Sequence, residues 1–324
     1  MTVSAVVFAY HDVGCRCLAT LIEAGVKVSL AVTHRDNPLE NVWFGSVSDM
    51  ARRAGIPVDT PADPNAAPFV SRVSALKPDL VFSFYYRHML NTALLAVPPR
   101  GAWNMHGSLL PRYRGRSPVN WAVLHGERET GMTLHRMAEK PDAGEILGQE
   151  SVPIGDNDTA HDVFGKLTPA AGRVLARALP ALVGNLGAWA NGNPPGARQQ
   201  NLAAGSYFGG RKPEDGRIDW QWDAWRVHNL VRAVAPPFPG AFTHLGGRRV
   251  GINRCWWAPP PADLPAKGAP GALAIHSGTL YARCGDGRWL ALREVAIGDD
   301  PALQGQALIG AFANAVQSMG QFSL

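Results

Sequence analysis

Short apolar runs alternate with helix-like segments through the first third of the chain, and this alternation constrains the fold more than any other feature. The apolar runs have the composition of strands covered on both faces, at Val3–Ala9, Val26–Thr33, Leu80–Phe84 and Gly101–Met105. Helical patterns lie between them, over Cys15–Ala24, Ser46–Ala54 and Pro68–Leu76. Strands that alternate with helices form right-handed βαβ units. The sequence therefore predicts an α/β fold with a Rossmann-like, doubly wound, mostly parallel sheet.

Ligands of such sheets bind beyond the carboxyl ends of the strands. Four stretches are expected to converge there: Tyr10–Gly14, which we predict to be a turn, Tyr85–Leu90, Asn104–Gly115 and Ala138–Gly144. No G-x-G-x-x-G motif follows the first strand, so nothing in the sequence supports a bound NAD.

The rest of the chain predicts a change of architecture. The pattern predicts a helix at Ser117–His125, strands at Thr130–Met137 and Glu145–Pro153, and a helix at Thr159–Leu182. Pro169 and Pro180 could kink or divide that last helix. A linker is expected at Asn191–Ala204. A helix at Trp225–Val234 then precedes five short strands, at Ala241–Leu245, Arg248–Trp257, Leu273–His276, Leu280–Cys284 and Trp289–Val295. We expect a catalytic domain over 1–204, a small OB-like β-barrel domain over 205–302 and a helical tail over 303–324.

Composition limits the function classes. The chain of 324 residues is 46% hydrophobic and 18% charged, which is typical of a globular protein with two domains. Its net charge of +5 is spread along the chain, so we expect no nucleic-acid partner. No signal peptide or membrane helix is evident, which predicts a cytoplasmic protein without membrane contact. The four cysteines lack zinc-site spacing, so free thiols and no metal are expected.

One stretch, Trp103–Asp142, concentrates residues that suit catalysis. Asn104 and His106 are two apart on a predicted strand, so their side chains point to the same face. An amide N–H and an imidazole in one small volume suit a reaction in which a carbonyl oxygen becomes an oxyanion while a proton moves. A distant aspartate could set the imidazole tautomer and raise its pKa. Ser108 lacks a G-x-S-x-G context, which favours a structural hydroxyl over a nucleophile.

Asn104-Met105-His106, followed by Ser108-Leu109-Leu110-Pro111 and by Gly115, resembles the signature of the folate-dependent formyltransferases. Asp142-Ala143-Gly144 is similar to the loop that faces the histidine in that family. The resemblance implies catalytic roles for Asn104, His106 and Asp142, with a protonated His106 and Asn104 stabilising the oxyanion. It also implies 10-formyltetrahydrofolate as the formyl donor, without metal or NAD, bound by His88, Met89, Leu90, Arg116, Ala138, Glu139, Lys140, Pro141 and Asp142.

Other motifs resemble one branch of this family, the domain of the bifunctional polymyxin-resistance protein that formylates UDP-4-amino-4-deoxy-L-arabinose. They include Val7–Cys15, Phe82–Leu90, Thr33-His34-x-Asp36-Asn37-Pro38, Arg112–Pro118, Thr133–Met137, His228–Val234 and Pro239–Phe242. This branch implies a UDP-amino-sugar acceptor and a role in lipid A modification and polymyxin resistance. The fused decarboxylase half of that protein has no counterpart here, so we expect a stand-alone enzyme, with any decarboxylase on another chain.

The acceptor is expected to contact Tyr10, His11, Asp12, Arg87 and Arg114, because these residues lie in the loops at the predicted strand ends. Two alternatives remain open at the level of the sequence. The chain could formylate methionyl-tRNA or another nucleotide-linked amino sugar with the same three catalytic residues. It could also be a non-catalytic binding module that retains the fold. The oligomeric state is not indicated by any motif.

Overall fold

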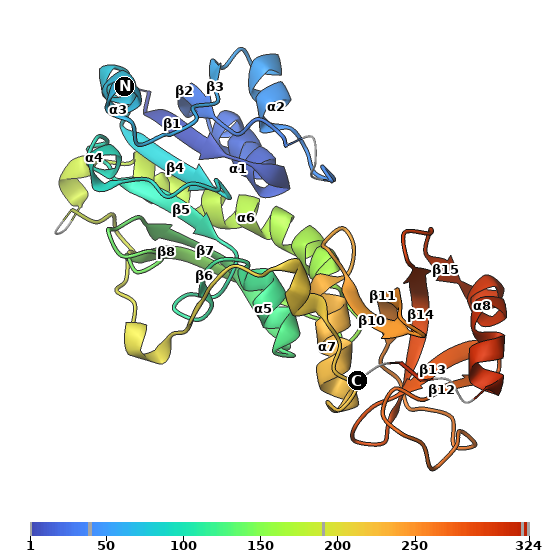
Figure 1. The fold of residues 1–324 in the computed structure, drawn as a ribbon. Coiled ribbons are helices and arrows are strands. Elements are labelled where there is room, and N and C mark those ends of the chain that lie inside the picture. The colour runs from blue at the N-terminus through green and yellow to red at the C-terminus, as the bar shows by residue number, and fades with distance from the viewer. Residues whose placement is uncertain (1, 38–40, 190–191, 319–320, 323–324) are drawn as a thin grey trace. The chain divides into compact units, whose positions relative to one another are not determined.

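The computed structural model describes residues 2–37, 41–189, 192–318 and 321–322 (Figure 1). The described chain divides into two compact units. Unit 1 comprises residues 1–118, 130–152 and 165–209, and unit 2 comprises residues 119–129, 153–164 and 210–324. Two short segments from the middle of the chain thus belong to the second unit.

Unit 1 is built on a seven-stranded sheet with the order β3-β2-β1-β4-β5-β7-β8. Its first five positions are parallel, and β5 then pairs antiparallel with β7. The strands are β1 (Ser4–Ala9), β2 (Lys27–Val32), β3 (Val58–Asp59), β4 (Leu80–Phe84), β5 (Ala102–His106), β7 (Glu129–Arg136) and β8 (Ile146–Pro153). The prediction of an α/β fold with a mostly parallel sheet is confirmed.

The central strand β1 shows why the sheet needs helices on both faces. Residues Ala5–Ala9 are completely buried, and successive side chains of a strand point to opposite faces. Val6 and Phe8 belong to a hydrophobic cluster with Phe69 and Val73 of α3 (Ala67–Ala75). On the alternate register, Ala9 lies against Gly14 of α1 (His11–Glu23). A continuous apolar run is therefore required at this strand.

Other helices complete unit 1 (Figure 1). They are α2 (Val47–Arg53), α4 (Thr92–Leu95) and α6 (Ala160–Val183), which begins in the residues of unit 2, together with 3-10 turns at Leu186–Ala188 and Leu202–Ala204. Gly172 of α6 lies against Arg16 and Thr20 of α1, so these two helices pack together. A two-stranded sheet joins β6 (Arg114–Gly115) to β9 (Tyr207–Phe208).

One sequence prediction in this unit is wrong. Tyr10–Gly14 is not a turn, because α1 already begins at His11 after an extended Tyr10 that makes no side-chain cap. The predicted helix at Thr159–Leu182 is present as α6, and of the two expected effects of Pro169 and Pro180, a kink or a division, the division does not occur. The strands β3, β6 and β9 and the helix α4 were not predicted, because each is only two to four residues long.

Unit 2 contains a six-stranded antiparallel sheet, in which β10, β11, β14, β13 and β12 follow one another and β15 pairs with β14. The strands are β10 (Ala241–Leu245), β11 (Arg248–Trp256), β12 (Leu273–His276), β13 (Thr279–Arg283), β14 (Trp289–Ile297) and β15 (Leu303–Gln304). Its helices are α5 (Pro118–Leu124), which begins at the last residue of a unit 1 segment, α7 (Ala224–Val234), α8 (Gly305–Gln317) and a 3-10 turn at Pro213–Gly216. The prediction of a small second domain built of β-strands is confirmed, and its sheet is antiparallel.

Trp220 is one of the largest fully buried side chains of unit 2. Its ring is completely buried and stacks on Phe322 with centroids 5.2 Å apart, and its Nε1–H donates to Thr243 Oγ1 at 3.0 Å.

The four cysteines are free, and three of them are buried. Among the described residues no helix is long and apolar enough to cross a membrane. Pro38 of the quoted motif, the start of the predicted linker at Asn191 and the end of the tail at Met319–Leu324 lie outside the described residues, apart from 321–322.

Replacing Phe8 by Ala tests the core of unit 1. The ring is fully buried on the central strand, so its loss should lower the free energy of unfolding by about 3–5 kcal/mol. The matched control is Ile22→Ala on α1, where the side chain is 39% exposed and the change should cost less than about 0.5 kcal/mol. Chemical denaturation of both variants measures the difference, and equal stabilities would contradict this account of the core.

Candidate active site

Strand β5 positions the first two predicted catalytic residues. It lies between β4 and β7, and the register places Asn104 opposite His135 and His106 opposite Thr133. The His106 side chain is 6% exposed, so its imidazole is largely withdrawn from water. The predicted side-by-side placement of Asn104 and His106 on one strand is therefore present in the fold.

Asp142 brings the network together. It lies in the turn after β7 with a φ of 53°, and its side chain is only 14% exposed. Its Oδ1 lies 3.6 Å from His106 Nδ1 and 3.4 Å from His135 Nε2, while its Oδ2 accepts a hydrogen bond from the Gly115 N–H at 2.9 Å. The carboxylate therefore has a partner on each oxygen, and the three predicted catalytic residues share one network.

His135 is the member of this network to which sequence reasoning assigned no role. Its Nδ1 is 2.9 Å from the Arg136 carbonyl oxygen, an acceptor, so Nδ1 carries a proton. Its Nε2 lies 3.1 Å from Asn104 Nδ2 and close to Asp142 Oδ1. His135 thus connects Asn104 to Asp142. The signal in the sequence was its place in the Thr133–Met137 motif, and the register that opposes it to Asn104 could not be read from the sequence.

The imidazole of His106 has a defined tautomer. Its Nε2 is 2.8 Å from the Tyr113 carbonyl oxygen, which can only accept, so Nε2–H donates there. The Nδ1 atom then carries the lone pair and faces Asp142. Ser108 is completely buried and donates to the Arg112 carbonyl oxygen at 2.6 Å, so it holds the same loop, in keeping with a structural hydroxyl.

Burial changes the protonation states of both partners. Burial lowers the pKa of His106, and the Asp142 carboxylate and the Tyr113 carbonyl only partly oppose this effect. Burial alone would raise the pKa of Asp142, but His106, His135 and the Gly115 N–H hold it well below its usual range. Burial thus outweighs the carboxylate at His106, so the pKa of His106 lies below the ordinary imidazole value. Asp142 itself raises the pKa of His106, as expected, and the protonated state that the resemblance assigns to His106 stays a prediction.

A second set of hydrogen bonds fixes the loop that follows His106. Thr133 Oγ1 donates to the Ser108 carbonyl oxygen at 2.6 Å and accepts from the Leu110 N–H at 3.2 Å. Gln149 Nε2 donates to the Leu110 carbonyl oxygen at 2.8 Å. On the facing loop, Gln200 Nε2 donates to the carbonyl oxygens of Asp142 and Gly144. Both loops are thus held by buried or partly buried side chains.

The residues that the family resemblance assigns to the folate lie in two surface loops and at one strand end. Met89 is 58% exposed and His88 is also exposed, whereas Leu90 is 8% exposed and belongs to the hydrophobic cluster under β1. Arg116 is exposed directly after β6. Ala138, Glu139 and Lys140 are exposed, and Pro141 is half-buried before Asp142. The side chains of His88, Met89 and Arg116 are therefore accessible, and that of Leu90 faces the core.

The residues predicted to contact the acceptor gather around an aromatic cluster at the ends of β1, β2 and β4. Tyr10 Oη donates to Asp36 Oδ1 at 2.7 Å, and the Arg87 guanidinium lies 4.7 Å from the centre of the Tyr10 ring. His11 stacks on Phe44 with ring centroids 4.1 Å apart. Asp12 Oδ1 accepts from the Gly45 N–H at 2.7 Å.

Arg114 is placed differently from the other predicted acceptor residues. It is only 8% exposed, and its backbone N–H donates to the Ser206 carbonyl oxygen at 3.0 Å within the β6–β9 region. No described residue accepts a hydrogen bond from its buried Nε. In the part of the chain that the structure describes, no group of three or more His, Cys, Asp or Glu side chains could hold a metal ion.

Gly144 is required for the close approach of the Asp142 loop to β7. A Cβ at this position would overlap the Arg136 carbonyl oxygen, which is part of the backbone and cannot rotate away. Gly144→Ala should therefore lower the free energy of unfolding by about 1–3 kcal/mol. Gly165→Ala is the matched control, because that helical site is open and alanine is favoured there by up to about 1 kcal/mol. Thermal unfolding compares the two, and equal melting temperatures would contradict the clash.

Comparison with known proteins adds to this geometry. The sequence matches the formyl transferase family over residues 31–179 and the C-terminal domain of formyl transferases over residues 211–312. Among solved structures, an N-formyltransferase from Helicobacter canadensis, in complex with folinic acid and dTDP-3-aminofucose, has a TM-score of 0.69 at 18% identity and covers 90% of this chain and 99% of its own.

Two further structures are similar. WlaRD, a sugar 3N-formyl transferase, has a TM-score of 0.67 at 16% identity over 90% of this chain and 97% of its own. A likely sugar N-formyltransferase from Mycobacterium tuberculosis has a TM-score of 0.59 at 18% identity over 81% of this chain and 100% of its own. At these levels of sequence identity, the likeness to the solved structures shows a shared fold and nothing further. The matches to both domains of one family, which together span more than half of the chain, show that the chain belongs to the formyl transferase family.

Proposed function

We propose that this chain transfers a formyl group from 10-formyltetrahydrofolate to the amine of a nucleotide-linked amino sugar. The observation that carries the proposal is the shared network of Asn104, His106 and Asp142 at the end of β5. Membership of the formyl transferase family supports the reaction type. The Helicobacter canadensis and WlaRD structures, crystallised with reduced folates and with dTDP or a dTDP-amino sugar, support the choice of donor and acceptor class.

Asn104 is suited to stabilise the negative charge that develops on the formyl oxygen during attack by the amine. Its Nδ2 lies 3.1 Å from His135 Nε2 and has two hydrogens, so at least one of them remains available as a donor that is already oriented by β5. A well-placed donor of this kind stabilises a transition state by roughly 3–4 kcal/mol.

His106 is suited to accept the proton that the attacking amine loses. It is neutral, and its Nδ1 lone pair faces Asp142 Oδ1 at 3.6 Å. When Nδ1 takes up the proton, the imidazolium forms beside a carboxylate that is already ionised, which favours the charged state. The same proton can then pass to N10, the departing nitrogen of the folate, so the protons balance without a covalent enzyme intermediate. The folate, when bound, supplies the formyl group.

The donor and acceptor contacts form the finer part of the proposal. His88, Met89 and Arg116 are accessible side chains that could contact the folate, together with the backbone of 138–142. We assign the acceptor to the cluster around Tyr10, His11 and Asp12. Their motif resemblance favours UDP-4-amino-4-deoxy-L-arabinose, whereas the nucleotide in the solved structures is dTDP. The choice of uridine as the nucleoside and of a pentose as the sugar is therefore supported by the sequence motifs alone.

Acceptor identity is tested by offering purified protein 10-formyltetrahydrofolate with one acceptor at a time and measuring product mass. UDP-4-amino-4-deoxy-L-arabinose should gain a formyl group, and dTDP-amino sugars should gain it more slowly. Formylated methionyl-tRNA without any formylated sugar nucleotide would overturn the proposal.

His106→Ala should reduce turnover by at least about 100-fold, because general acid–base groups contribute that much or more. Near-normal turnover by a folded His106→Ala variant would contradict the assigned mechanism.

The pH dependence separates the roles of His106 and Asp142. Because the reaction needs neutral His106 and burial lowers its pKa, kcat/KM should rise with pH through a midpoint below the ordinary imidazole value of 6.5. Asp142→Asn removes the carboxylate that raises this pKa, so the midpoint should move to still lower pH. The plateau should fall by roughly 10- to 100-fold, because the imidazolium loses its charged partner.

The control for this measurement is Asp49→Asn on exposed helix α2, which removes the same charge without touching the network. Both the midpoint and the plateau of this variant should match those of the unchanged protein. A midpoint above 6.5 in the unchanged protein, or an identical midpoint in Asp142→Asn, would rule out neutral His106 as the proton acceptor.

A further inference from the structure

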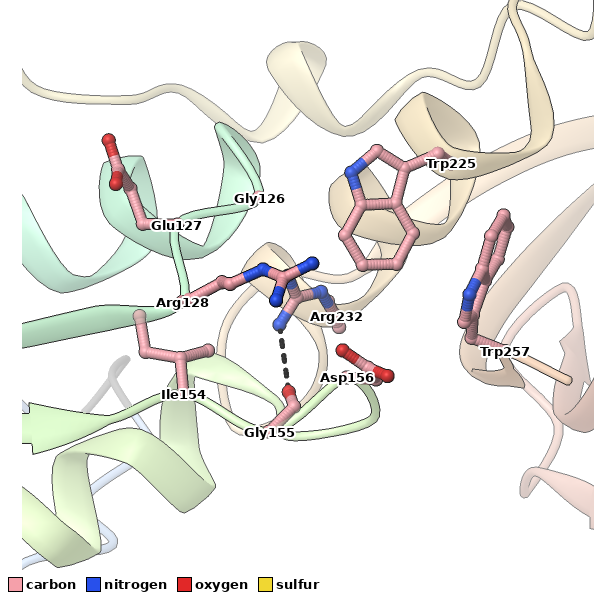
Figure 2. Close-up of a pocket in the computed structure, with 9 residues that line it drawn as sticks. All are labelled: Gly126, Glu127, Arg128, Ile154, Gly155, Asp156, Trp225, Arg232 and Trp257. Atoms are coloured by element: carbon pink, nitrogen blue, oxygen red, sulfur yellow. Dashed lines mark hydrogen bonds between the residues drawn. The ribbon is translucent and has the colours of Figure 1, made fainter.

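Unit 2 contains a cavity of about 240 Å³ that the proposed reaction does not use (Figure 2). It is lined by residues 126–128 and 154–156, by Trp225 and Arg232 of α7, and by Trp257 directly after β11. All of its lining residues belong to unit 2, whereas Asn104, His106 and Asp142 belong to unit 1. Its volume is below the roughly 300–1,000 Å³ typical of sites for drug-sized ligands. It therefore suits a small molecule or one end of a larger one.

Arg232 supplies a buried cation at the wall of this cavity. The residue is 3% exposed, with Nε donating to Asn229 Oδ1 at 2.8 Å and Nη1 donating to the Gly155 and Asp158 carbonyl oxygens at 3.3 Å. Among the described residues, none accepts a hydrogen bond from Nη2. Nη2 is not among the buried donors that lack a partner, so it faces the accessible space of the cavity. An anion in the cavity would accept a charge-assisted hydrogen bond from it.

Arg128 adds a second cation. It directly precedes β7, and in Figure 2 its side chain extends into the space lined by Arg232 and Trp225. Its guanidinium forms no hydrogen bond or ion pair with any residue that the structure describes. Guanidinium groups bind carboxylates and phosphates through two parallel hydrogen bonds. Two such groups lining one cavity favour an anionic ligand.

Two indole rings form the apolar wall. The ring centroids of Trp225 and Trp257 are 4.7 Å apart with an interplanar angle of 65°, so the rings meet edge to face. Neither indole Nε1–H donates to a described residue. Rings in this arrangement can accept a flat group against one face and donate to an acceptor at the edge. The wall therefore suits a planar body attached to the anion.

We propose that this cavity binds a small ligand in which a phosphate or carboxylate is attached to a flat ring, with Arg128 and Arg232 holding the anion and Trp225 and Trp257 holding the ring. This site is separate from the residues proposed to transfer the formyl group, and the proposal does not depend on that function.

The acidic side chains near the cavity act on Arg232 through their charge without pairing with it. The Glu127 carboxylate points away from the guanidinium groups in Figure 2. Burial lowers the pKa of Arg232, and Asp158 and Asp156 raise it without forming an ion pair with it among the described residues. A cationic ligand is disfavoured because the indoles already have guanidinium groups near them. The Arg232 guanidinium lies 5.4 Å from the centre of Trp225, and that of Arg288 lies 4.1 Å from the centre of Trp257.

Fluorine NMR of the full chain, labelled with 5-fluorotryptophan, tests the proposal. The ten tryptophans give ten signals, and Trp225→Phe and Trp257→Phe identify the two that report on the cavity. Phenyl phosphate titrated to millimolar concentration should shift these two signals saturably. Three control compounds should each bind at least about tenfold more weakly than phenyl phosphate. Phenol lacks the anion, inorganic phosphate lacks the ring, and phenyltrimethylammonium has a positive charge in place of the negative one.

Arg128→Glu should weaken phenyl phosphate binding by about tenfold or more, because it reverses one of the two charges that hold the anion. Arg248→Glu, an exposed arginine of the same unit that does not line the cavity, is the matched control and should leave binding unchanged. The remaining eight fluorine signals report whether each variant is folded. Absence of a saturable shift, equal effects of the two arginine variants, or tighter binding of phenyltrimethylammonium would each overturn the proposal.

Discussion

The buried carboxylate of Asp142 is the interaction on which the active-site region depends. Its two oxygens meet two imidazoles and the Gly115 N–H, which come from β5, β7 and the loop after His106. A carboxylate removed from water without such partners would be protonated or displaced. Three segments that are distant in the sequence must therefore be placed correctly before one charge is stable. The same requirement fixes the geometry of Asn104 and His106.

The electrostatic consequence is a division of labour between the two partners. Asp142 is ionised because its neighbours compensate for burial, while His106 is neutral because one nearby carboxylate does not. The site thus holds a fixed negative charge next to a base that becomes positive only during proton transfer. Dipoles and charges that are already oriented need no reorganisation when charge develops. Paired groups with protonation states pushed in opposite directions are typical of acid–base catalysis.

The strands and most helices were predictable because their apolar periodicity records which faces are buried. The pair Asn104 and His106 was predictable for the same reason, since the alternation of a strand places both on one face. His135 was not, because its partnership with Asn104 arises from the register of an antiparallel pair that no local pattern specifies. The protonation state of His106 also depends on burial by distant segments. The start of α1 at His11 was missed because Tyr10 provides no side-chain cap.

The cavity of unit 2 shows the opposite treatment of a buried charge. Asp142 has a partner on both oxygens, whereas Arg232, only 3% exposed as a residue, leaves Nη2 facing the cavity without an acceptor among the described residues. A fold that only needed to stabilise Arg232 could do so with one more carbonyl oxygen, as it already does with those of Gly155 and Asp158. Instead the open donor meets a cavity lined by a second guanidinium and two indoles. A complete network holds a catalytic geometry in place, and an incomplete one beside a cavity is the arrangement that a bound anion completes.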